Sequence, residues 1–398
     1  MKKRIVFITV LVFWSVISFS GGWIAYSRLG PVLDPKPSAN PLLDEVWAYV
    51  RSSFVGAIPS DTVRNYGEIK GALATLDDRW TVFIEPQPRA IEREHLAGQF
   101  GGIGVNVHQG SDGSIIMSPL LDSPAQMAGI MEGDVLVGID GVLLPAKPDL
   151  NNVASRVRGN IGTTVRITVL RQGKQLEFTI IRKAIVVPSV DWHIITGTSS
   201  ISPTIGYIAI HQFTEHTGTE VQQALRQLRE QHSQAYIVDL RDNGGGLLNT
   251  AVNVASEFLD SGTVLFERRR GQPDVSFPAT KQPDGVYREP MAVLINGNTA
   301  SAAEIVAGAI QDNQRGKLIG QKTFGKGSVQ SIFDLSDGSS VHITSAEWLT
   351  PKKRTIDGVG LMPDIVVARP TVAGQNGQDT QLDRALAELH AALAQQVQ

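Results

Sequence analysis

Between residues 205 and 313 the sequence alternates short apolar runs with longer helical stretches. Apolar runs at 205–213, 236–240 and 291–296 are followed by helical patterns at 217–231, 247–259 and 301–313. Strands that alternate with helices usually pair in parallel, because each helix returns the chain to the same end of the sheet. This part of the chain is therefore predicted to form an α/β domain built from βαβ units.

A different pattern precedes this domain. Five β-type runs separated by turn residues, and two short helical segments at 123–130 and 149–158, lie between residues 98 and 184; the runs are GGIGVNVHQ, GSIIMSPL, DVLVGIDGV, TTVRITVLRQ and KQLEFTIIRK. Short strands with regular turn signals predict a compact β-rich module. Residues 42–97 are mainly helical in pattern, and 28–41 form a linker rich in Pro, Ser and Asn. The C-terminal 371–398 combine a Gly/Gln/Asn linker with an amphipathic helix.

The N-terminus has the pattern of an export signal. Lys2, Lys3 and Arg4 precede a stretch from Ile5 to Ser27 that carries no charge. A basic segment followed by an apolar one is typical of secretion. Small residues before Gly21 would suit cleavage, yet the stretch is also long enough, at roughly 20 residues per span, to stay as a membrane anchor. Residues 1–27 are thus a signal peptide or signal anchor, and the body is expected outside the cytoplasm.

Composition excludes several classes of site. The 398 residues include no cysteine, so a thiol nucleophile, a disulfide framework and a thiolate metal site are all excluded. The net charge is -3 even with the three N-terminal cations counted, so the body is mildly acidic. Nucleic acid is therefore not expected as a partner, because phosphate backbones require clustered Lys and Arg.

Three glycine-flanked loops of the α/β region are candidates for chemistry. The first, Arg241-Asp-Asn-Gly-Gly-Gly246, directly follows an apolar strand. Consecutive glycines allow a ligand to approach the backbone and let several N–H groups point to one place. A plain flexible turn has the same composition.

The second loop, NTASAAE, places Ser301 at the start of a helix. Ser301 and Glu304 match the S-x-x-E capping box, so Ser301 could serve only as an N-cap. A nucleophile at a helix N-terminus has the same local sequence, and there the unpaired N–H of Ala302 can stabilise an oxyanion.

The third loop, TFGKGSVQ, carries Lys326 between two glycines. It differs from a P-loop because Gly327 follows the lysine where Ser or Thr is required, and because 329–335 has a strand pattern instead of a helical one. A strand beginning near Lys326 would put Lys326, Ser328 and Gln330 on one face. Lysine can act as a general base for serine only when burial keeps it neutral, and a solvated loop lysine is the alternative. The eight histidines fall in no hydrolase motif.

Together NTASAAE, TFGKGSVQ and the upstream DLRDNGGG resemble the carboxy-terminal processing peptidases, also called tail-specific proteases. The resemblance implies Ser301 as nucleophile, Lys326 as general base and Gln330 as the residue that orients the lysine. It further implies an oxyanion hole made by the amides of Ala302 and one glycine of 244–246, most simply Gly245. No metal and no cofactor is implied. The family has an α/β multidomain fold, with a ClpP/crotonase-like βαβ protease core at 185–370 and an inserted PDZ domain at 98–184.

The same resemblance gives the PDZ domain a function. Gly101, Gly102, Ile103 and Gly104 match its carboxylate-binding loop, whose N–H groups hold a C-terminal carboxylate while the tail adds as a strand. Arg158 matches a position that couples the PDZ domain to the protease site in some members. The expected partners are protein substrates with exposed C-termini, with an adaptor protein and homo-oligomers through the terminal helices as further candidates. The expected location is the bacterial periplasm, either free after signal cleavage or anchored to the inner membrane.

These features predict an exported serine endopeptidase that captures C-terminal tails and cleaves them with a Ser301–Lys326 dyad. A non-catalytic binding or adaptor protein with a degenerate protease fold is the alternative. The presence of Ser301, Lys326 and Gln330 together argues against it.

Overall fold

The computed structural model describes residues 40–196, 203–368 and 379–396. These residues fall into two compact units, one that ends at Ile69 and one that begins at Lys70. The predicted signal at 1–27 and nearly all of the linker at 28–41 lie outside the described residues. Within the described ranges, no helix is both long enough and apolar enough to cross a membrane.

The first unit contains two helices, α2 (Pro41–Ser53) and the beginning of α3 (Asp61–Ala74). Asn40 caps α2 by accepting a hydrogen bond from the Leu43 N–H, and Pro41 occupies the first turn, where no donor is needed. Trp47 Nε1 donates to Glu68 Oε1 at 2.9 Å and so joins the two helices. Neither helix contains a fully buried residue.

The second unit is built around a six-stranded sheet with the order β10-β11-β12-β15-β16-β19. Five of its strands are parallel: β11 (Ile205–Ile210), β12 (Ala235–Asp239), β15 (Met291–Ile295), β16 (Lys317–Gly320) and β19 (Ile365–Val366). The edge strand β10 (Val190–Ile195) is antiparallel. The predicted parallel α/β arrangement is confirmed.

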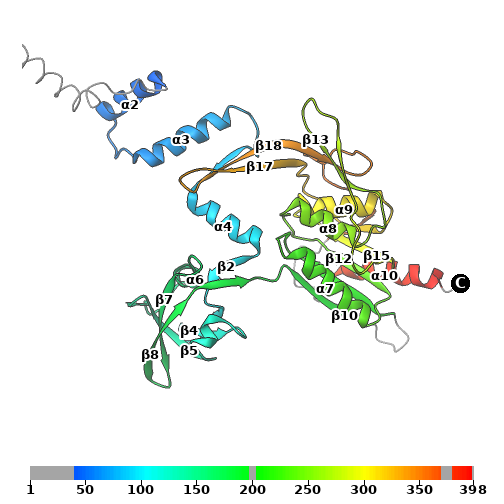
Figure 1. The fold of residues 1–398 in the computed structure, drawn as a ribbon, viewed down its shortest axis with the longest axis horizontal. Coiled ribbons are helices and arrows are strands. Elements are labelled where there is room, and N and C mark those ends of the chain that lie inside the picture. The colour runs from blue at the N-terminus through cyan, green and yellow to red at the C-terminus, as the bar shows by residue number, and fades with distance from the viewer. Residues whose placement is uncertain (1–39, 197–202, 369–378, 397–398) are drawn as a thin grey trace, which may run out of the picture. The chain divides into compact units, whose positions relative to one another are not determined.

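Helices cover both faces of this sheet (Figure 1). One face packs against α7 (Thr217–Glu230), α8 (Leu248–Ser256) and α9 (Ala302–Asp312), and the other packs against α10 (Thr380–Gln396). Strand β15 shows why a continuous apolar run is needed. Val293 and Ile295 point toward α7–α9, while Ala292 and Leu294 point toward α10. Both faces of this strand are buried, so apolar side chains are favoured on each of them.

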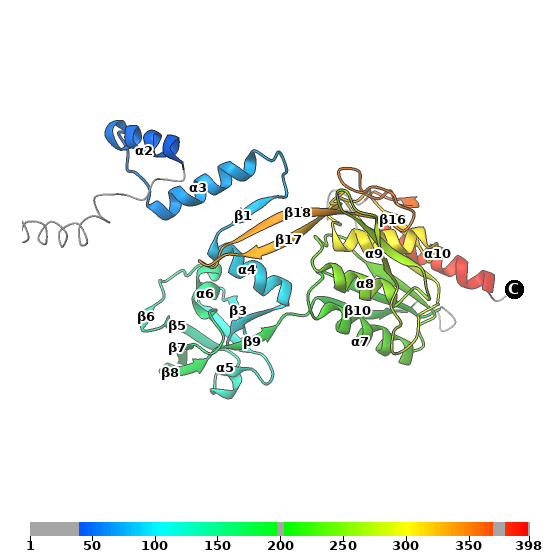
Figure 2. The same ribbon diagram turned by 45° about the horizontal axis from the view of Figure 1, so that its top comes forward.

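A second, antiparallel sheet contains the strand that follows Lys326, and Figure 2 shows its strands β1, β17 and β18. It contains β1 (Val82–Ile84), β13 (Thr263–Arg268), β14 (Val275–Pro278), β17 (Ser328–Asp334) and β18 (Ser340–Leu349). Strands β17 and β18 form a hairpin, and β17 confirms the strand predicted after Lys326. Helix α4 (Pro86–Ala97) belongs to the region predicted to be mainly helical, and Pro86 suits the first turn because no N–H donor is needed there.

The β-rich module has its own sheet and core. Its main sheet has the order β3-β4-β5-β7-β8, with β3 (Val105–Gln109), β4 (Ile115–Pro119), β5 (Asp134–Ile139), β7 (Thr164–Arg171) and β8 (Lys174–Ile181). The short β6 (Val142–Leu143) pairs with β5, and the two predicted helices are α5 (Pro124–Met127) and α6 (Leu150–Val157). A separate pair, β2 (Gln99–Gly102) with β9 (Lys183–Val186), lies where the chain enters and leaves the module. Strand β3 is an edge strand, so one side of it is open to pairing.

Candidate active site

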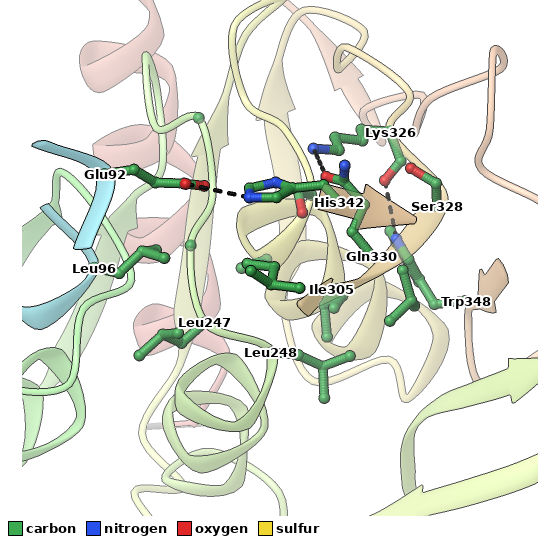
Figure 3. Close-up of a pocket in the computed structure, with 16 residues that line it drawn as sticks. Glu92, Leu96, Leu247, Leu248, Ile305, Lys326, Ser328, Gln330, His342 and Trp348 are labelled. Carbon is green, nitrogen blue, oxygen red and sulfur yellow. Dashed lines mark hydrogen bonds and ion pairs between the residues drawn. The ribbon is translucent and has the colours of Figure 1, made fainter. Parts of the chain in front are cut away.

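A cavity of about 280 Å³ brings together residues from all three candidate loops (Figure 3). Each loop contributes lining residues to this cavity. The start of α9 contributes Ser301 and Ala302, the segment leading into β17 and its first residues contribute Lys326 and Gln330, and the loop after β12 contributes Gly244 and Gly246. The carboxyl ends of parallel strands meet at one edge of a sheet, which is why the loops after β12 and β15 converge here. The sequence-predicted Ser301, Ala302, Lys326 and Gln330 therefore share one cavity.

Ser301 sits in a strained turn. It precedes α9 with φ 54° and ψ -118°, a backbone region that a residue with a side chain rarely adopts. The turn is held by its neighbours: the Ala300 N–H donates to the Asn243 carbonyl at 2.9 Å, and Thr299 Oγ1 donates to the Leu240 carbonyl at 2.8 Å. Backbone strain of this kind is common at functional sites, where the surrounding contacts maintain it. The turn is therefore consistent with a nucleophile presented to a ligand.

Glu304 joins the serine turn to the lysine loop. Its carboxylate is fully buried and accepts a hydrogen bond from the Ser301 N–H at 2.9 Å, which is one half of the predicted capping box. It also accepts from the N–H groups of Gly325 at 2.8 Å and Lys326 at 2.9 Å, and from Thr323 Oγ1 at 2.5 Å. The S-x-x-E pattern predicted the first contact, whereas the other three join segments far apart in sequence and were missed.

Lys326 is held in a largely desolvated place. Its Nζ donates to Gln330 Oε1 at 3.0 Å and lies 4.4 Å from the centre of the Trp80 ring. Gln330 is fixed in turn because its Nε2 donates to the Trp80 carbonyl at 2.6 Å. Burial lowers the pKa of Lys326 below its ordinary value, which favours the neutral amine that a general base requires. Trp80 was not identified from the sequence, because it acts through tertiary contacts only.

In this conformation Lys326 and Ser301 are not hydrogen-bonded to each other. Among the contacts of the described residues, the hydrogen bond of Lys326 Nζ goes to Gln330. Both side chains line the same cavity, and a lysine side chain has enough rotatable bonds to exchange one partner for another.

The glycine loop packs against the serine. A Cβ atom placed on Gly245 would lie 2.8 Å from Ser301 Cβ and 3.0 Å from the Ala302 nitrogen, so only glycine fits there. The Gly245 N–H, however, donates to Asn243 Oδ1 at 2.8 Å and is occupied in this conformation. Gly244 and Gly246 are the glycines of this loop that line the cavity. An oxyanion hole that uses Gly245 therefore requires Asn243 to release this amide.

An ionic network, buried at Arg241 and Asp239 and partly exposed at Asp379, anchors the same loop to the C-terminal helix. Arg241 Nη2 lies 2.6 Å from Asp239 Oδ2 and 2.8 Å from Asp379 Oδ2. Tyr207 donates to Asp239 at 2.6 Å, and Arg241 Nη1 donates to Gln381 Oε1 at 3.1 Å. Asp379 and Gln381 lie at the beginning of α10, so this helix helps to hold the loop that ends in Gly244–Gly246.

The predicted tail-binding residues divide into two groups. Gly101 and Gly102 belong to β2 and pair with Ala184 and Lys183 of β9. Ile103, which is buried, and Gly104, at φ 68°, form the turn that leads into the edge strand β3. Arg158, at the end of α6, lies 4.1 Å from the centre of the Phe100 ring.

Comparison with known proteins identifies the family. Residues 204–367 match the model of peptidase family S41, and residues 101–181 match that of the PDZ domain. A carboxyl-terminal-processing protease from Synechocystis is 37% identical over 331 residues, which are 82% of this chain and 76% of the relative. The chain belongs to peptidase family S41.

Two further similar proteins are also C-terminal processing proteases. A carboxy-terminal-processing protease from Bartonella bacilliformis is 36% identical over 85% of this chain and 77% of its own length. Among solved structures, a photosystem II D1 C-terminal processing protease superimposes with a TM-score of 0.50 at 30% identity, covering 86% of this chain and 91% of its own. This S41 chain is thus a serine peptidase that carries a PDZ domain.

Proposed function

We propose that this protein is an exported endopeptidase that captures C-terminal tails of other proteins through its PDZ domain and cleaves them with a Ser301–Lys326 dyad. The observation that carries the proposal is that Ser301 and Lys326 line one cavity, and that the buried Glu304 binds the backbone of both residues. A degenerate binding protein would have no need to keep a desolvated lysine and a strained serine turn in one cavity.

The chemistry follows from these positions. Neutral Lys326 takes the Ser301 hydroxyl proton while Oγ bonds to the scissile carbonyl carbon, and the oxyanion is stabilised by the Ala302 N–H and an amide of the glycine loop. The lysine ammonium then returns the proton to the leaving amine as the C–N bond breaks. Water, deprotonated by Lys326, hydrolyses the acyl-enzyme, which releases a carboxylate and the free serine. Gln330 keeps the lysine near the serine between these steps.

The PDZ domain supplies tail capture. Edge strand β3 follows the Ile103–Gly104 turn directly, so an extended tail could add beside it with its carboxylate at the turn. A ClpP/crotonase-like protease core at 185–370, a PDZ domain at 98–184 and helical segments at 42–97 and 371–398 are the domain bounds that we propose with this function.

Cleavage assays test the dyad. Ser301→Ala and Lys326→Ala should each abolish cleavage of an unstructured protein while circular dichroism stays unchanged. Lys322→Ala, which removes an exposed lysine of the same loop, is the matched control and should keep the wild-type rate. Wild-type protein that leaves every unstructured substrate intact would favour the binding-protein alternative.

Tail capture needs its own test. Amidation of the C-terminus removes the carboxylate that the PDZ turn is proposed to bind, so an amidated peptide should be cleaved with a raised KM. Equal kinetics for free and amidated tails would refute tail recognition without touching the dyad.

We also propose an extracytoplasmic location, most simply the bacterial periplasm, on the basis of residues 1–27. A fusion of residues 1–41 to a reporter enzyme that is active only after export should be active. Replacement of Lys2, Lys3 and Arg4 by glutamate should abolish the reporter activity. A reporter that is active in both fusions would contradict the proposal that residues 1–27 are an export signal.

A further inference from the structure

Two side chains of the catalytic cavity have no part in the chemistry described above. Glu92 enters the cavity from α4, and His342 enters it from β18 (Figure 3). Their Oε2 and Nε2 atoms are 3.3 Å apart. His342 is buried, with 5% of its surface exposed, and its Nε2 also lies 3.2 Å from Ser340 Oγ.

Glu92 is held in place by a chain of ionic contacts. Arg89, itself buried, donates to Glu92 Oε2 at 2.9 Å and to Asp334 Oδ1 at 3.0 Å. Arg93 Nη2 lies 2.7 Å from the same Asp334 oxygen. Asp334 is the last residue of β17, the strand that carries Gln330. These contacts hold α4 against the end of the β17–β18 hairpin that is next to its turn. Glu92, on the same helix, lines the cavity together with Lys326.

The charged side chains around Lys326 have opposing effects on its pKa. Burial is the largest cause of its lowered pKa, and the carboxylate of Glu92 is the largest opposing cause. Arg79, before β1, lowers the pKa of Lys326 further, while Asp357, in the loop that contacts Gly327, raises it. Burial lowers the pKa of His342, whose neighbours are Glu92 and Arg89 on α4, Lys326 itself and Asp334 on β17.

We propose that Glu92 is a positioning residue of this active site, held by Arg89 and His342 so that its carboxylate stays in the cavity that Lys326 also lines. The inference rests on the proposed function, since it concerns the lysine that acts as base. A carboxylate fixed beside an ammonium favours the protonated lysine, and only the neutral lysine can accept the serine proton. Glu92 therefore sets how alkaline the solution must be before the site becomes active.

Glu92→Gln tests this placement, because it keeps the shape of the side chain and removes its charge. The acidic limb of the kcat/KM profile should move to lower pH, since the ammonium of Lys326 loses a stabilising neighbour. The variant-to-wild-type ratio of kcat/KM at about pH 6 should exceed the same ratio at about pH 9.5 by roughly 2- to 10-fold.

Glu94→Gln is the matched control. It removes one charge from the same helix at a side chain that lines a different cavity, and its profile should keep the wild-type shape. A Glu92→Gln profile with the wild-type shape would overturn the inference, even if its overall rate were lower, because a merely structural effect lowers the rate at every pH. Failure of the proposed dyad is separable, since Lys326→Ala would then still cleave.

Discussion

At the scale of single residues, Glu304 is the group on which the geometry of the site depends most. One buried carboxylate accepts four hydrogen bonds, two of them from the backbone N–H groups of Ser301 and Lys326. Ser301 and Lys326 lie in different loops, and this side chain binds the backbone of both.

Glu304→Gln should therefore lower kcat by roughly 100-fold, because a misplacement of about 1 Å between reacting groups has an effect of that size. The glutamine amide has one acceptor oxygen in place of the two carboxylate oxygens. Its NH₂ group would face N–H and O–H donors and could not accept their hydrogen bonds. Glu267→Gln, which removes a buried carboxylate from β13 outside the cavity, is the control and should keep its kcat. A Glu304→Gln enzyme with wild-type kcat would contradict this role.

Glu257 provides a residue-scale test of the core that is independent of catalysis. Burial raises the pKa of Glu257 to about 7, although a hydrogen bond from Gln222 Nε2 at 2.8 Å opposes the shift. The folded protein therefore binds a proton more tightly than the unfolded chain does. Stability should fall as pH rises from about 4.5 to about 7, and this loss is complete above the folded pKa.

Glu257→Gln removes the group that titrates in this window. The variant should be more stable than the wild type at about pH 8, by about 1–3 kcal/mol, and should show a flatter dependence of Tm on pH. Parallel Tm curves for the two proteins between about pH 5 and 8 would show that Glu257 does not titrate there.

At the scale of elements, local sequence pattern predicted those parts of the site that a single segment determines. The capping pattern at Ser301 predicted the beginning of α9, and alternation after Lys326 predicted β17. Strands β13 and β14 and the contacts of Trp80 could not be predicted in the same way. They depend on pairing with β18 and on packing against Lys326, which no local pattern records.

Helix α10 is expected to affect catalysis from outside the cavity. Asp379→Asn weakens the ionic contact with Arg241 and so loosens the loop that carries Gly244–Gly246. We expect kcat to fall by about 10-fold with little change in KM, because the oxyanion donors are displaced whereas tail capture is not. Glu388→Gln, which breaks an exposed ion pair of the same helix, should leave kcat unchanged. Equal effects of the two substitutions would argue against a specific anchor.

At the scale of the whole molecule, the sequence was sufficient for the order of domains and for the family. Parallel α/β alternation, the β-rich module and the three loops are each visible in the chain, and Ser301, Ala302, Lys326 and Gln330 do share one cavity. The choice of glycine for the oxyanion hole could not be made from sequence, because the Asn243 side chain decides which amide is free.

An exposed apolar face of α2 concerns the assembly of several copies of the protein. Leu42, Val46 and Tyr49 lie along one side of α2 and are 70%, 49% and 66% exposed in the chain taken alone. Residues at this spacing form one helix face, which fits the proposed homo-oligomer through terminal helices. Protein lacking residues 1–27 should sediment as an oligomer at micromolar concentration, and Tyr49→Glu should shift it to the monomer. A monomeric parent protein would contradict assembly through this face.

The central claim is that Ser301 is a nucleophile activated by Lys326. Its most direct test is the rate at which a fluorophosphonate forms a covalent adduct, followed by intact mass and peptide mapping. We expect one adduct, on Ser301. The rate at which it forms should increase with pH, match the wild type in Lys322→Ala and fall by roughly 100-fold or more in Lys326→Ala. An adduct on another residue, or wild-type labelling of a folded Lys326→Ala protein, would contradict it.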